Sequence, residues 1–275
     1  MTDECKELEK KAKRMEKENP NEAIELYKQA SQCFDQHENP KNKNSNLEKA
    51  AKLLRVVGKS NEDPTIALDY FEESSSIYTE IGKKGDTEKV MQEAYQKFID
   101  AAKSISSEAR KMDIADAAEG KFKLAAGYAA LGMDRELSNK CWIESGDQFY
   151  NDAKTIENPR EAFEIFKHAI LNYNKGNAED KFDLLLTDAA EKFYKKGSEI
   201  YKTKKSLVLA IDNFLQAENI YRYMSLEQKS QESDQKIQEI CERIGIVKDS
   251  IVDYLENQQT TAVSFSDITP PSRQP

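Results

Sequence analysis

Small and aromatic residues alternate with polar ones in a sixteen-residue phrase that recurs four times along this chain. In each copy a small residue is followed by an aromatic residue four positions later, a second small residue three further on and a second aromatic residue four beyond that. These offsets place all four positions on one face of an α-helix, so the phrase predicts a helix that packs through this face. The four stripes are Ala23/Tyr27/Ala30/Phe34, Ala67/Phe71/Ser74/Tyr78, Ala162/Phe166/Ala169/Tyr173 and Ala210/Phe214/Ala217/Tyr221.

The start of each phrase carries residues that favour the beginning of a helix. Asn19, Asp63 and Asn158 can cap, and each stands before a proline that fits the first helical turn. Ser206 begins the fourth copy without a proline. The interval between the second and third copies is about twice the other two, which predicts a weaker copy between them. That copy is Ala118/Phe122/Ala125/Ala129.

A second helix is expected before each phrase. Upstream segments carry a large residue, a small residue four positions later and a large residue three beyond that, and residues 47–58 supply an earlier equivalent through Leu54/Gly58. This combination resembles the tetratricopeptide repeat, a helical hairpin of roughly 34 residues. The resemblance implies an all-α fold of antiparallel hairpins forming a twisted right-handed solenoid. The upstream segments are Phe98/Ala102/Ile105, Trp142/Gly146/Phe149 and Phe193/Gly197/Ile200.

The pattern divides the chain into three predicted regions. Residues 1–225 form the tetratricopeptide-like repeat array, and residues 226–256 keep apolar side chains at helical spacing and form a C-terminal cap. Residues 257–275 are polar and contain proline, which predicts a disordered tail. Polar loops are expected over 37–45 and 82–86.

Composition and charge exclude several classes of function. The formal net charge is −9 and the pI is about 5.1, which argues against nucleic acid as a partner because binding phosphates requires a basic surface. No apolar run reaches the roughly 20 residues that a membrane span needs. We therefore expect a cytoplasmic monomer that reaches membranes only through its partners. The four cysteines have no paired spacing and are expected to be reduced thiols in the core.

No catalytic or metal-binding pattern is evident. The chain has two histidines, His37 and His168, and contains no HExxH, CxxC or serine–histidine–carboxylate arrangement. The segment 82–85 lacks the length and the serine or threonine of a phosphate-binding loop, so it is interpreted as a turn that ends a helix. His168 is expected to be partly buried and Trp142 to pack between helices. The sequence thus predicts a non-enzyme without metal or cofactor.

Two phrases carry a closer resemblance. They are DPTIALDYFEESSSIYTEIGK at 63–83 and KLAAGYAALGM at 123–133. With the length and the acidic pI of the chain, they make the stretch 63–155 similar to the soluble NSF attachment proteins, the adaptors of SNARE-complex disassembly. The resemblance implies a non-enzymatic adaptor that binds a SNARE-like coiled-coil bundle and couples it to an AAA ATPase of the NSF type.

The resemblance also implies a partner-binding surface. In that family, lysines and arginines on one face of the helical sheet grip the acidic surface of the SNARE bundle. The matched phrases place Lys83 and Lys89 at two of the family's basic positions. Lys121 and Lys123 lie near two others, one or two residues out of register. Such lysines would steer and orient an acidic helical bundle through charge-assisted contacts.

The chain departs from the family at two places. The family's membrane-touching, Phe-containing loop corresponds here to residues 17–20, which contain no aromatic residue, so direct membrane contact is not expected. The family's leucine near the C-terminus is absent from 272–275, so the ATPase is engaged differently or is not the partner. The alternative is a generic tetratricopeptide-type scaffold whose groove holds a peptide or disordered tail. An enzyme built on helical repeats would instead need a deep pocket with converging carboxylates.

Overall fold

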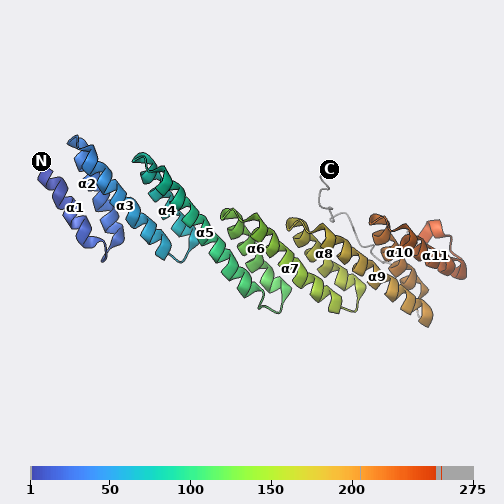
Figure 1. Cartoon of the computed structure of the whole chain (residues 1–275). Coiled ribbons are helices and arrows are strands. Elements are labelled where there is room, and N and C mark those ends of the chain that lie inside the picture. Colours follow the sequence, from blue (N-terminus) through green and yellow to red (C-terminus); the bar gives the residue numbers. More distant parts are fainter. Residues whose placement is uncertain (1, 205, 252–254, 256–275) are drawn as a thin grey trace. The chain divides into compact units, whose positions relative to one another are not determined.

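The computed structural model describes residues 2–204, 206–251 and 255, and these residues form an all-α structure. Eleven α-helices follow one another along this part of the chain (Figure 1). The tail predicted over 257–275 lies outside the described residues. The helices are α1 (Thr2–Met15), α2 (Pro20–Gln36), α3 (Pro40–Ser60), α4 (Pro64–Glu80), α5 (Lys84–Ala109), α6 (Ala115–Leu131), α7 (Arg135–Thr155), α8 (Pro159–Lys175), α9 (Glu179–Thr203), α10 (Leu207–Tyr223) and α11 (Glu227–Ile244), followed by the short 3-10 helix η1 (Lys248–Ser250).

The chain divides into two compact units. The first comprises residues 1–105 and 127–135, and the second comprises 106–126 and 136–275. The first unit therefore contains α1 to α4 with most of α5 and the end of α6. The second contains the remainder of α5 and α6 together with nearly all of α7 and the helices that follow.

Consecutive helices pack on one another, which confirms the predicted hairpins. In the first unit α1, α2, α3 and α4 each contact the next, and in the second unit α8, α9, α10 and α11 do the same. Helices α5 and α6 meet through the rings of Phe98 and Tyr128, whose centroids lie 5.6 Å apart. Helices α7 and α8 meet where the Tyr173 hydroxyl donates to a carboxylate oxygen of Asp147 at 2.8 Å.

The helices of the repeat phrase begin where their capping residues predict. The side chains of Asn19, Asp63, Asn158 and Ser206 each accept a backbone N–H two or three residues later. The three prolines occupy the first turn of their helices. Each cap satisfies an N–H group that the helix itself leaves without a partner, so these few residues set the helix boundaries.

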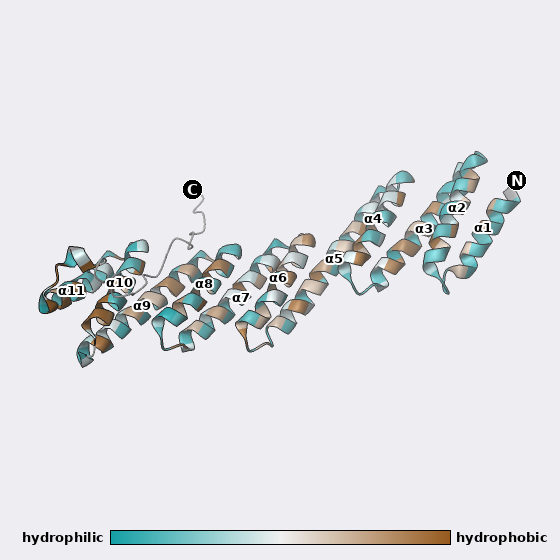
Figure 2. Cartoon of the chain, turned by 180° about the vertical axis from the view of Figure 1, so that it is seen from behind, coloured by the Kyte–Doolittle hydropathy of each residue, from teal (hydrophilic) through white to brown (hydrophobic). Residues whose placement is uncertain are grey.

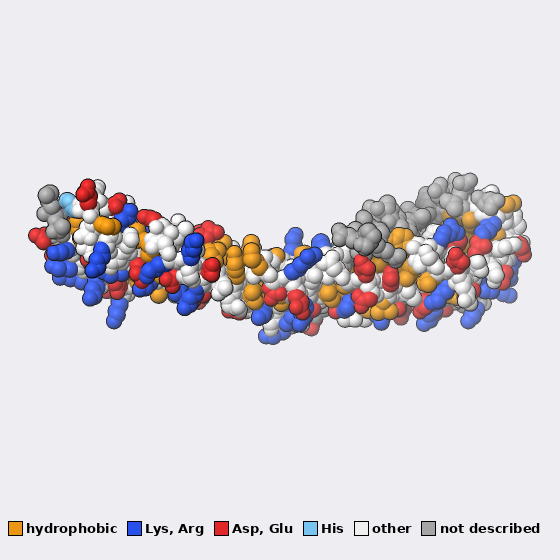
Figure 3. All heavy atoms as spheres, turned by 45° about the horizontal axis from the view of Figure 1, so that its top comes forward, with side chains coloured by type: hydrophobic (Ala, Val, Ile, Leu, Met, Phe, Trp, Pro, Cys, Tyr) orange, Lys and Arg blue, Asp and Glu red, His pale blue; other side chains and the backbone are white. Residues whose placement is uncertain are grey.

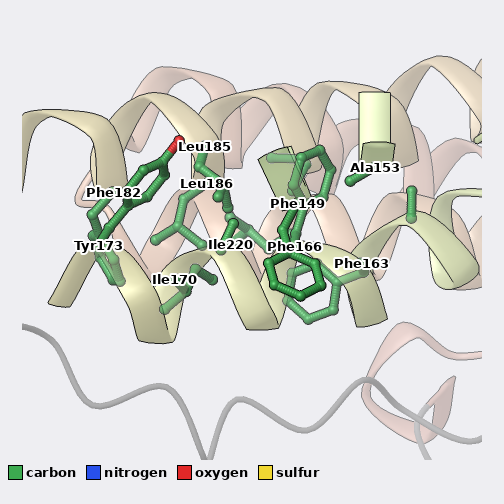
Figure 4. Packing of buried hydrophobic residues seen from close by; sticks show 14 of the residues in the cluster. Phe149, Ala153, Phe163, Phe166, Ile170, Tyr173, Phe182, Leu185, Leu186 and Ile220 are labelled. Carbon is green, nitrogen blue, oxygen red and sulfur yellow. The ribbon is translucent and has the colours of Figure 1, made fainter. Parts of the chain in front are cut away.

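The small and aromatic stripes form the core of both units. Every member of the four stripes is at most 3% exposed, and the four residues of the weaker copy at 118–129 are fully buried. Figure 4 shows the second unit, where Phe149 of α7 lies beside Phe163 and Phe166 of α8. Small residues let the helix axes approach, while the rings fill the space between them. The prediction that these stripes are structural is confirmed.

In one hairpin, the register of the first helix against the second differs from the prediction. A Cβ on Gly58 or on Gly197 would stand 3.2 Å from the carbonyl oxygen of the first alanine in the next stripe. A Cβ on Gly146 would instead stand 3.3 Å from the carbonyl of the second alanine. Gly146 therefore occupies a position two turns earlier, because seven residues make two helical turns. The residue of α7 equivalent to Gly197 is therefore Ala153, which is fully buried. Phe149 is then the first large residue of the large–small–large motif, whereas it was predicted to be the last.

Two predicted loops are shorter than expected. Helix α3 begins at Pro40, because the Asn39 side chain accepts the backbone N–H three residues later and proline fits the first turn. The loop predicted over 37–45 therefore ends at Asn39. Helix α5 begins at Lys84, so the turn predicted over 82–86 is also shorter, and its first glycine adopts a φ of 76°.

Helices of neighbouring hairpins are tied at a regular interval. Four side-chain pairs, each separated by 38 to 40 residues, join one first helix of a hairpin to the equivalent helix of the next. Within each unit the helices thus form a layer of first helices beside a layer of second helices. The pairs are Glu9–Lys49 and Arg55–Glu93 in the first unit, and Tyr150–Asp188 and Glu191–Lys229 in the second.

The cysteines fall into two groups. Cys5 of α1 and Cys33 of α2 form a disulfide, so the expectation of reduced thiols is wrong for this pair. They are 28 residues apart and meet because α1 and α2 pack side by side. Cys141 and Cys241 are free and buried, as predicted. Burial raises the pKa of the Cys141 thiol to about 11.

Hydropathy varies within the helices of both units (Figure 2). Figure 2 shows hydrophilic and hydrophobic residues distributed around each helix. Among the described residues, no helix combines the length and the apolar character needed to cross a membrane.

Candidate functional site: the basic face of α3

The two helices of the second hairpin carry opposite charge. Helix α3 has six basic side chains and one acidic side chain, whereas α4 has four acidic side chains and none that is basic. No other hairpin among the described residues separates charge so completely. The basic residues of α3 are Lys41, Lys43, Lys49, Lys52, Arg55 and Lys59, and the acidic residues of α4 are Asp69, Glu72, Glu73 and Glu80.

Helical periodicity sends the lysines of α3 to the side opposite the core. Leu47, Leu54 and Gly58 are buried against the neighbouring helices. Lys52 and Lys59 lie seven residues apart, which places both on one face, and their side chains are 62% and 51% exposed. We call the outward side of α3 that carries these two lysines the basic face. Figure 3 shows Lys and Arg side chains (blue) on the surface of the first unit, with Asp and Glu side chains (red) among them.

One acidic residue lies between two cations at the margin of the basic face. Glu48 forms ion pairs with Lys52 at 2.7 Å and with Lys83, from the turn before α5, at 2.8 Å. These two lysines lower the pKa of Glu48 below its usual value. A single carboxylate therefore compensates only one of the two ammonium charges beside it.

A second acidic residue repeats this arrangement nearer the C-terminal end of α3. Glu93 of α5 accepts Arg55 through both guanidinium nitrogens that face it, and it also accepts Lys59 at 2.9 Å. Arg55 is the main cause of the lowered pKa of Glu93, and Lys59 adds to it. Again two cations share one carboxylate. Asp86 also acts on Lys52 and Arg55, and the four cations still outnumber these three carboxylates.

The C-terminal end of α3 adds to this excess. Lys97 of α5 donates to the backbone carbonyl of Lys59 at 2.9 Å and thereby caps the helix. Carbonyl groups at a helix C-terminus carry partial negative charge and favour cations there. The second unit uses the same device, because Lys192 of α9 donates to the carbonyl of Lys154 at the end of α7 at 3.2 Å. The repeat therefore delivers lysines to the ends of first helices in both units.

The structure places two of the four predicted site residues beside the basic face. Lys83 is paired with Glu48 at its margin. Lys89 is exposed on α5, four residues before Glu93 and hence on the same side of that helix. Both belong to the first unit.

The other two predicted residues belong to the second unit. Lys121 of α6 is half-buried and pairs with Glu108, whereas Lys123 is exposed. Residues two apart on a helix project from different faces, so this pair does not present a shared surface on α6. The structure does not bring Lys121 and Lys123 together as it does the lysines of α3.

Sequence reasoning missed the basic residues of α3 itself. Their signal was present as six basic residues against one acidic residue in the 21 positions of the helix. The loop predicted over 37–45 also assigned the first turn of this helix to a loop. The family resemblance directed attention to later positions instead. Counting charge by helix would have found this surface, because its contrast with α4 does not depend on tertiary contacts.

Two residues singled out in the sequence lie at the edges of the core. His168 is exposed, not partly buried as predicted, and its ring stacks on Phe149 with the centroids 5.0 Å apart. Trp142 is half-buried, and the Lys175 ammonium lies 4.4 Å from the centroid of its ring. The two-turn difference in the register of α7 explains why Trp142 is not in the core.

A groove of about 390 Å³ lies in the first unit between α2, the start of α3 and α4. It is lined by charged and polar side chains with a few apolar ones. Lys28 pairs with Glu73 across it, and Lys43 reaches Glu80 at 3.7 Å and Asp35 at 3.2 Å. A ligand for this groove would need groups that replace these ion pairs.

Comparison with known proteins identifies no family. No model of a protein family matches the chain, and a search of curated proteins finds no significant match.

Proposed function

We propose that this chain is a non-enzymatic adaptor whose basic face binds the acidic surface of a helical bundle. The observation that carries the proposal is the excess of cations along α3, where Glu48 and Glu93 are each shared by two basic groups. Exposed ammonium groups on a rigid helix steer an acidic partner and set its orientation. The partner in this proposal is a SNARE-like coiled-coil bundle, as the resemblance to soluble NSF attachment proteins implies.

In this proposal the hairpins are tetratricopeptide-like repeats that continue as a twisted right-handed solenoid, with α11 and η1 as its C-terminal cap. Packing of α11 on α10, and the burial of Ile237, Ile240 and Ile251 in one cluster there, support the capping role. In this arrangement the chain acts as a cytoplasmic monomer, and an AAA ATPase of the NSF type disassembles the bundle that it holds.

A binding measurement tests the role of the basic face. The double variant Lys52→Glu/Lys59→Glu should bind a recombinant acidic four-helix bundle about tenfold or more weakly, measured by fluorescence anisotropy at low salt. The control is Lys140→Glu/Lys202→Glu, which makes the same charge change at exposed lysines of α7 and α9. Binding by the unchanged chain should also weaken as salt rises.

Two results would contradict this proposal. One is the absence of binding to the acidic bundle at low salt. The other is an equal loss from the test pair and the control pair, because net charge and not the basic face would then determine the affinity. Thermal unfolding of each variant checks that the fold is retained, since exposed substitutions change stability by roughly 0.5 kcal/mol or less.

The coupling step needs its own measurement. An NSF-type ATPase with ATP should disassemble a fluorescently labelled bundle faster in the presence of this chain. Lys52→Glu/Lys59→Glu should remove the acceleration. Bundle binding without any acceleration would retain the binding proposal and reject the ATPase as partner.

The groove in the first unit supports a second candidate function. Its volume of about 390 Å³ and its mixed lining would suit a short peptide with both charges, as in a generic tetratricopeptide-type scaffold. Glu73→Ala should weaken peptide binding without affecting the acidic bundle. The same variant therefore separates the two candidates.

A further inference from the structure

Three side chains with metal-binding atoms meet where the start of α1 lies against the end of α2. Cys5 is fully buried on α1, while Cys33 and His37 lie at the C-terminal end of α2. The two sulfur atoms and a ring nitrogen of His37 all lie within 4.8 Å of one another. No comparable group that includes a cysteine or histidine occurs elsewhere in the described part of the chain.

The local geometry of α2 places two of these side chains close together. Cys33 and His37 are four residues apart, so they lie on the same side of α2. His37 is the residue that ends this helix, and its backbone N–H donates to the carbonyl of Phe34 at 3.2 Å. The free carbonyl groups at a helix C-terminus favour a positive charge nearby. Both the ligand spacing and the end of the helix thus suit a cation.

The third ligand is supplied by packing of α1 on α2. Cys5 and Cys33 are joined as a disulfide with their Cα atoms 5.5 Å apart. A tetrahedral Zn²⁺ ion with Zn–S bonds of about 2.3 Å would hold the same two sulfurs about 3.8 Å apart. Rotation of the two side chains is enough for a change of that size, so α1 and α2 can keep their packing.

We propose that, in the reduced protein, Cys5, Cys33 and His37 bind one Zn²⁺ ion. Two thiolates and an imidazole are ligands that zinc prefers, and three protein ligands leave a fourth position for water. The disulfide and the metal ion are then alternative links between α1 and α2. This inference is independent of the adaptor function, because it involves neither α3 nor the basic face.

The disulfide is exchanged for the metal ion in two steps. A trialkylphosphine and one water molecule reduce the disulfide to two thiols, and the phosphine becomes a phosphine oxide. Zn²⁺ then displaces the two thiol protons and binds both sulfurs and the neutral imidazole, with no further change of oxidation state. Since protons compete for all three ligands, the affinity for the metal should fall as the pH is lowered.

The experiment uses the full chain, reduced with tris(2-carboxyethyl)phosphine, and Co²⁺ as a spectroscopic probe. We expect one equivalent of Co²⁺ per chain, with thiolate-to-cobalt charge-transfer absorption and the intense visible bands of tetrahedral cobalt. Zn²⁺ should abolish these bands by displacement. The unreduced protein, whose Cys5 and Cys33 are bonded to each other, should give none.

Variants assign the ligands. Cys33→Ser should remove the charge-transfer absorption, and His37→Ala should weaken Co²⁺ binding by about tenfold or more. His37 is only partly buried and Cys5 is fully buried, so His37→Ala tests the site with less risk to the fold than a change at Cys5. The control is Cys141→Ser/Cys241→Ser, which should bind Co²⁺ as the unchanged chain does.

The proposal is overturned by any of three results. These are a reduced chain without charge-transfer absorption, bands that survive in Cys33→Ser, and bands that are lost in the Cys141→Ser/Cys241→Ser control. Circular dichroism of each variant, recorded alongside, separates the loss of a ligand from the loss of the fold.

Discussion

The hairpin α3/α4 in the first unit and the hairpin α9/α10 in the second share one packing scheme but place their charges differently. In both, a glycine of the first helix packs on the first alanine and first phenylalanine of the second helix, with the same 3.2 Å approach to the alanine carbonyl. The charged side chains of α3 and α4 are all at least partly exposed, and the two signs lie mainly on different helices. In α10, by contrast, the Asp212 carboxylate is only 2% exposed.

The ion pairs between successive second helices show the same difference. In the first unit Lys28 of α2 pairs with Glu73 of α4, and the two side chains are 24% and 44% exposed. In the second unit both carboxylate oxygens of Asp212 accept hydrogen bonds from Nη2 of Arg160, at 2.7 and 2.6 Å. The repeat therefore determines which helices meet, while individual substitutions decide whether a charge at that contact stabilises the core or remains available at the surface.

The largest expected effect lies in what the two hairpins share. Phe71→Ala and Phe214→Ala should each lower the free energy of unfolding by about 3–5 kcal/mol, because both rings are at most 1% exposed and leave a cavity when removed. Denaturant unfolding followed by circular dichroism measures both. Val56→Ala, at a position 59% exposed, is the control and should cost about 0.5 kcal/mol or less. Costs that differ severalfold between Phe71 and Phe214 would mean that the packing is not equivalent.

The next largest effect on stability should differ between the two units. Arg160→Ala should destabilise the protein by about 3–5 kcal/mol, because it leaves the buried Asp212 carboxylate without that cation. Lys28→Ala should cost about 1 kcal/mol or less, because its partner is partly solvated. The same unfolding measurement compares them. Similar costs for the two variants would contradict the distinction between buried and exposed pairs.

A smaller effect should depend on pH in the first unit. Arg55 and Lys59 hold the pKa of Glu93 below its unfolded value of about 4.5, so this carboxylate stabilises the fold above that pH. The stabilisation should disappear as the pH falls through the lowered folded pKa. Glu93→Gln should therefore cost roughly 1 kcal/mol at neutral pH and less at pH 3, as measured by unfolding at both values. A cost that is independent of pH would show that the charge of Glu93 does not contribute.

The smallest expected effect concerns reactivity and not stability. At pH 8 a thiol reagent should modify the native protein slowly, because burial raises the pKa of Cys141 to about 11 and also raises that of Cys241. Denaturation without reductant should expose two thiols, and denaturation with reductant should expose all four cysteines. Four reactive thiols in the unreduced, denatured protein would show that Cys5 and Cys33 are not linked.

Much of the fold could be read from local sequence. The caps at Asn19, Asp63 and Asn158 marked helix starts correctly, since they act within three residues of themselves. The predicted loop over 37–45 failed although Asn39 and Pro40 carry the same signal, because no aromatic stripe of the repeat phrase follows them. The capping signals were therefore reliable wherever they were applied.

The candidate site was less predictable. Lys83 and Lys89 were predicted from a family resemblance, and the structure places them beside the basic face of α3, which that resemblance did not identify. The register of α7 was misplaced by two turns, because Trp142 and Phe149 satisfy the same spacing rule. The approach of Gly146 to the second alanine of α8 and the full burial of Ala153 distinguish the two choices.

By itself the sequence determined the helices, their core-facing stripes and their succession as hairpins, because these follow from contacts within one or two turns and from a repeat that carries the same pattern again. Only the tertiary structure decided which charges are shared and which residues far apart in sequence meet. Glu48 lies between Lys52 and Lys83, and Cys5 reaches Cys33, through packing between helices. Contacts of this kind depend on the relative rotation of two helices, and small errors in register change them completely.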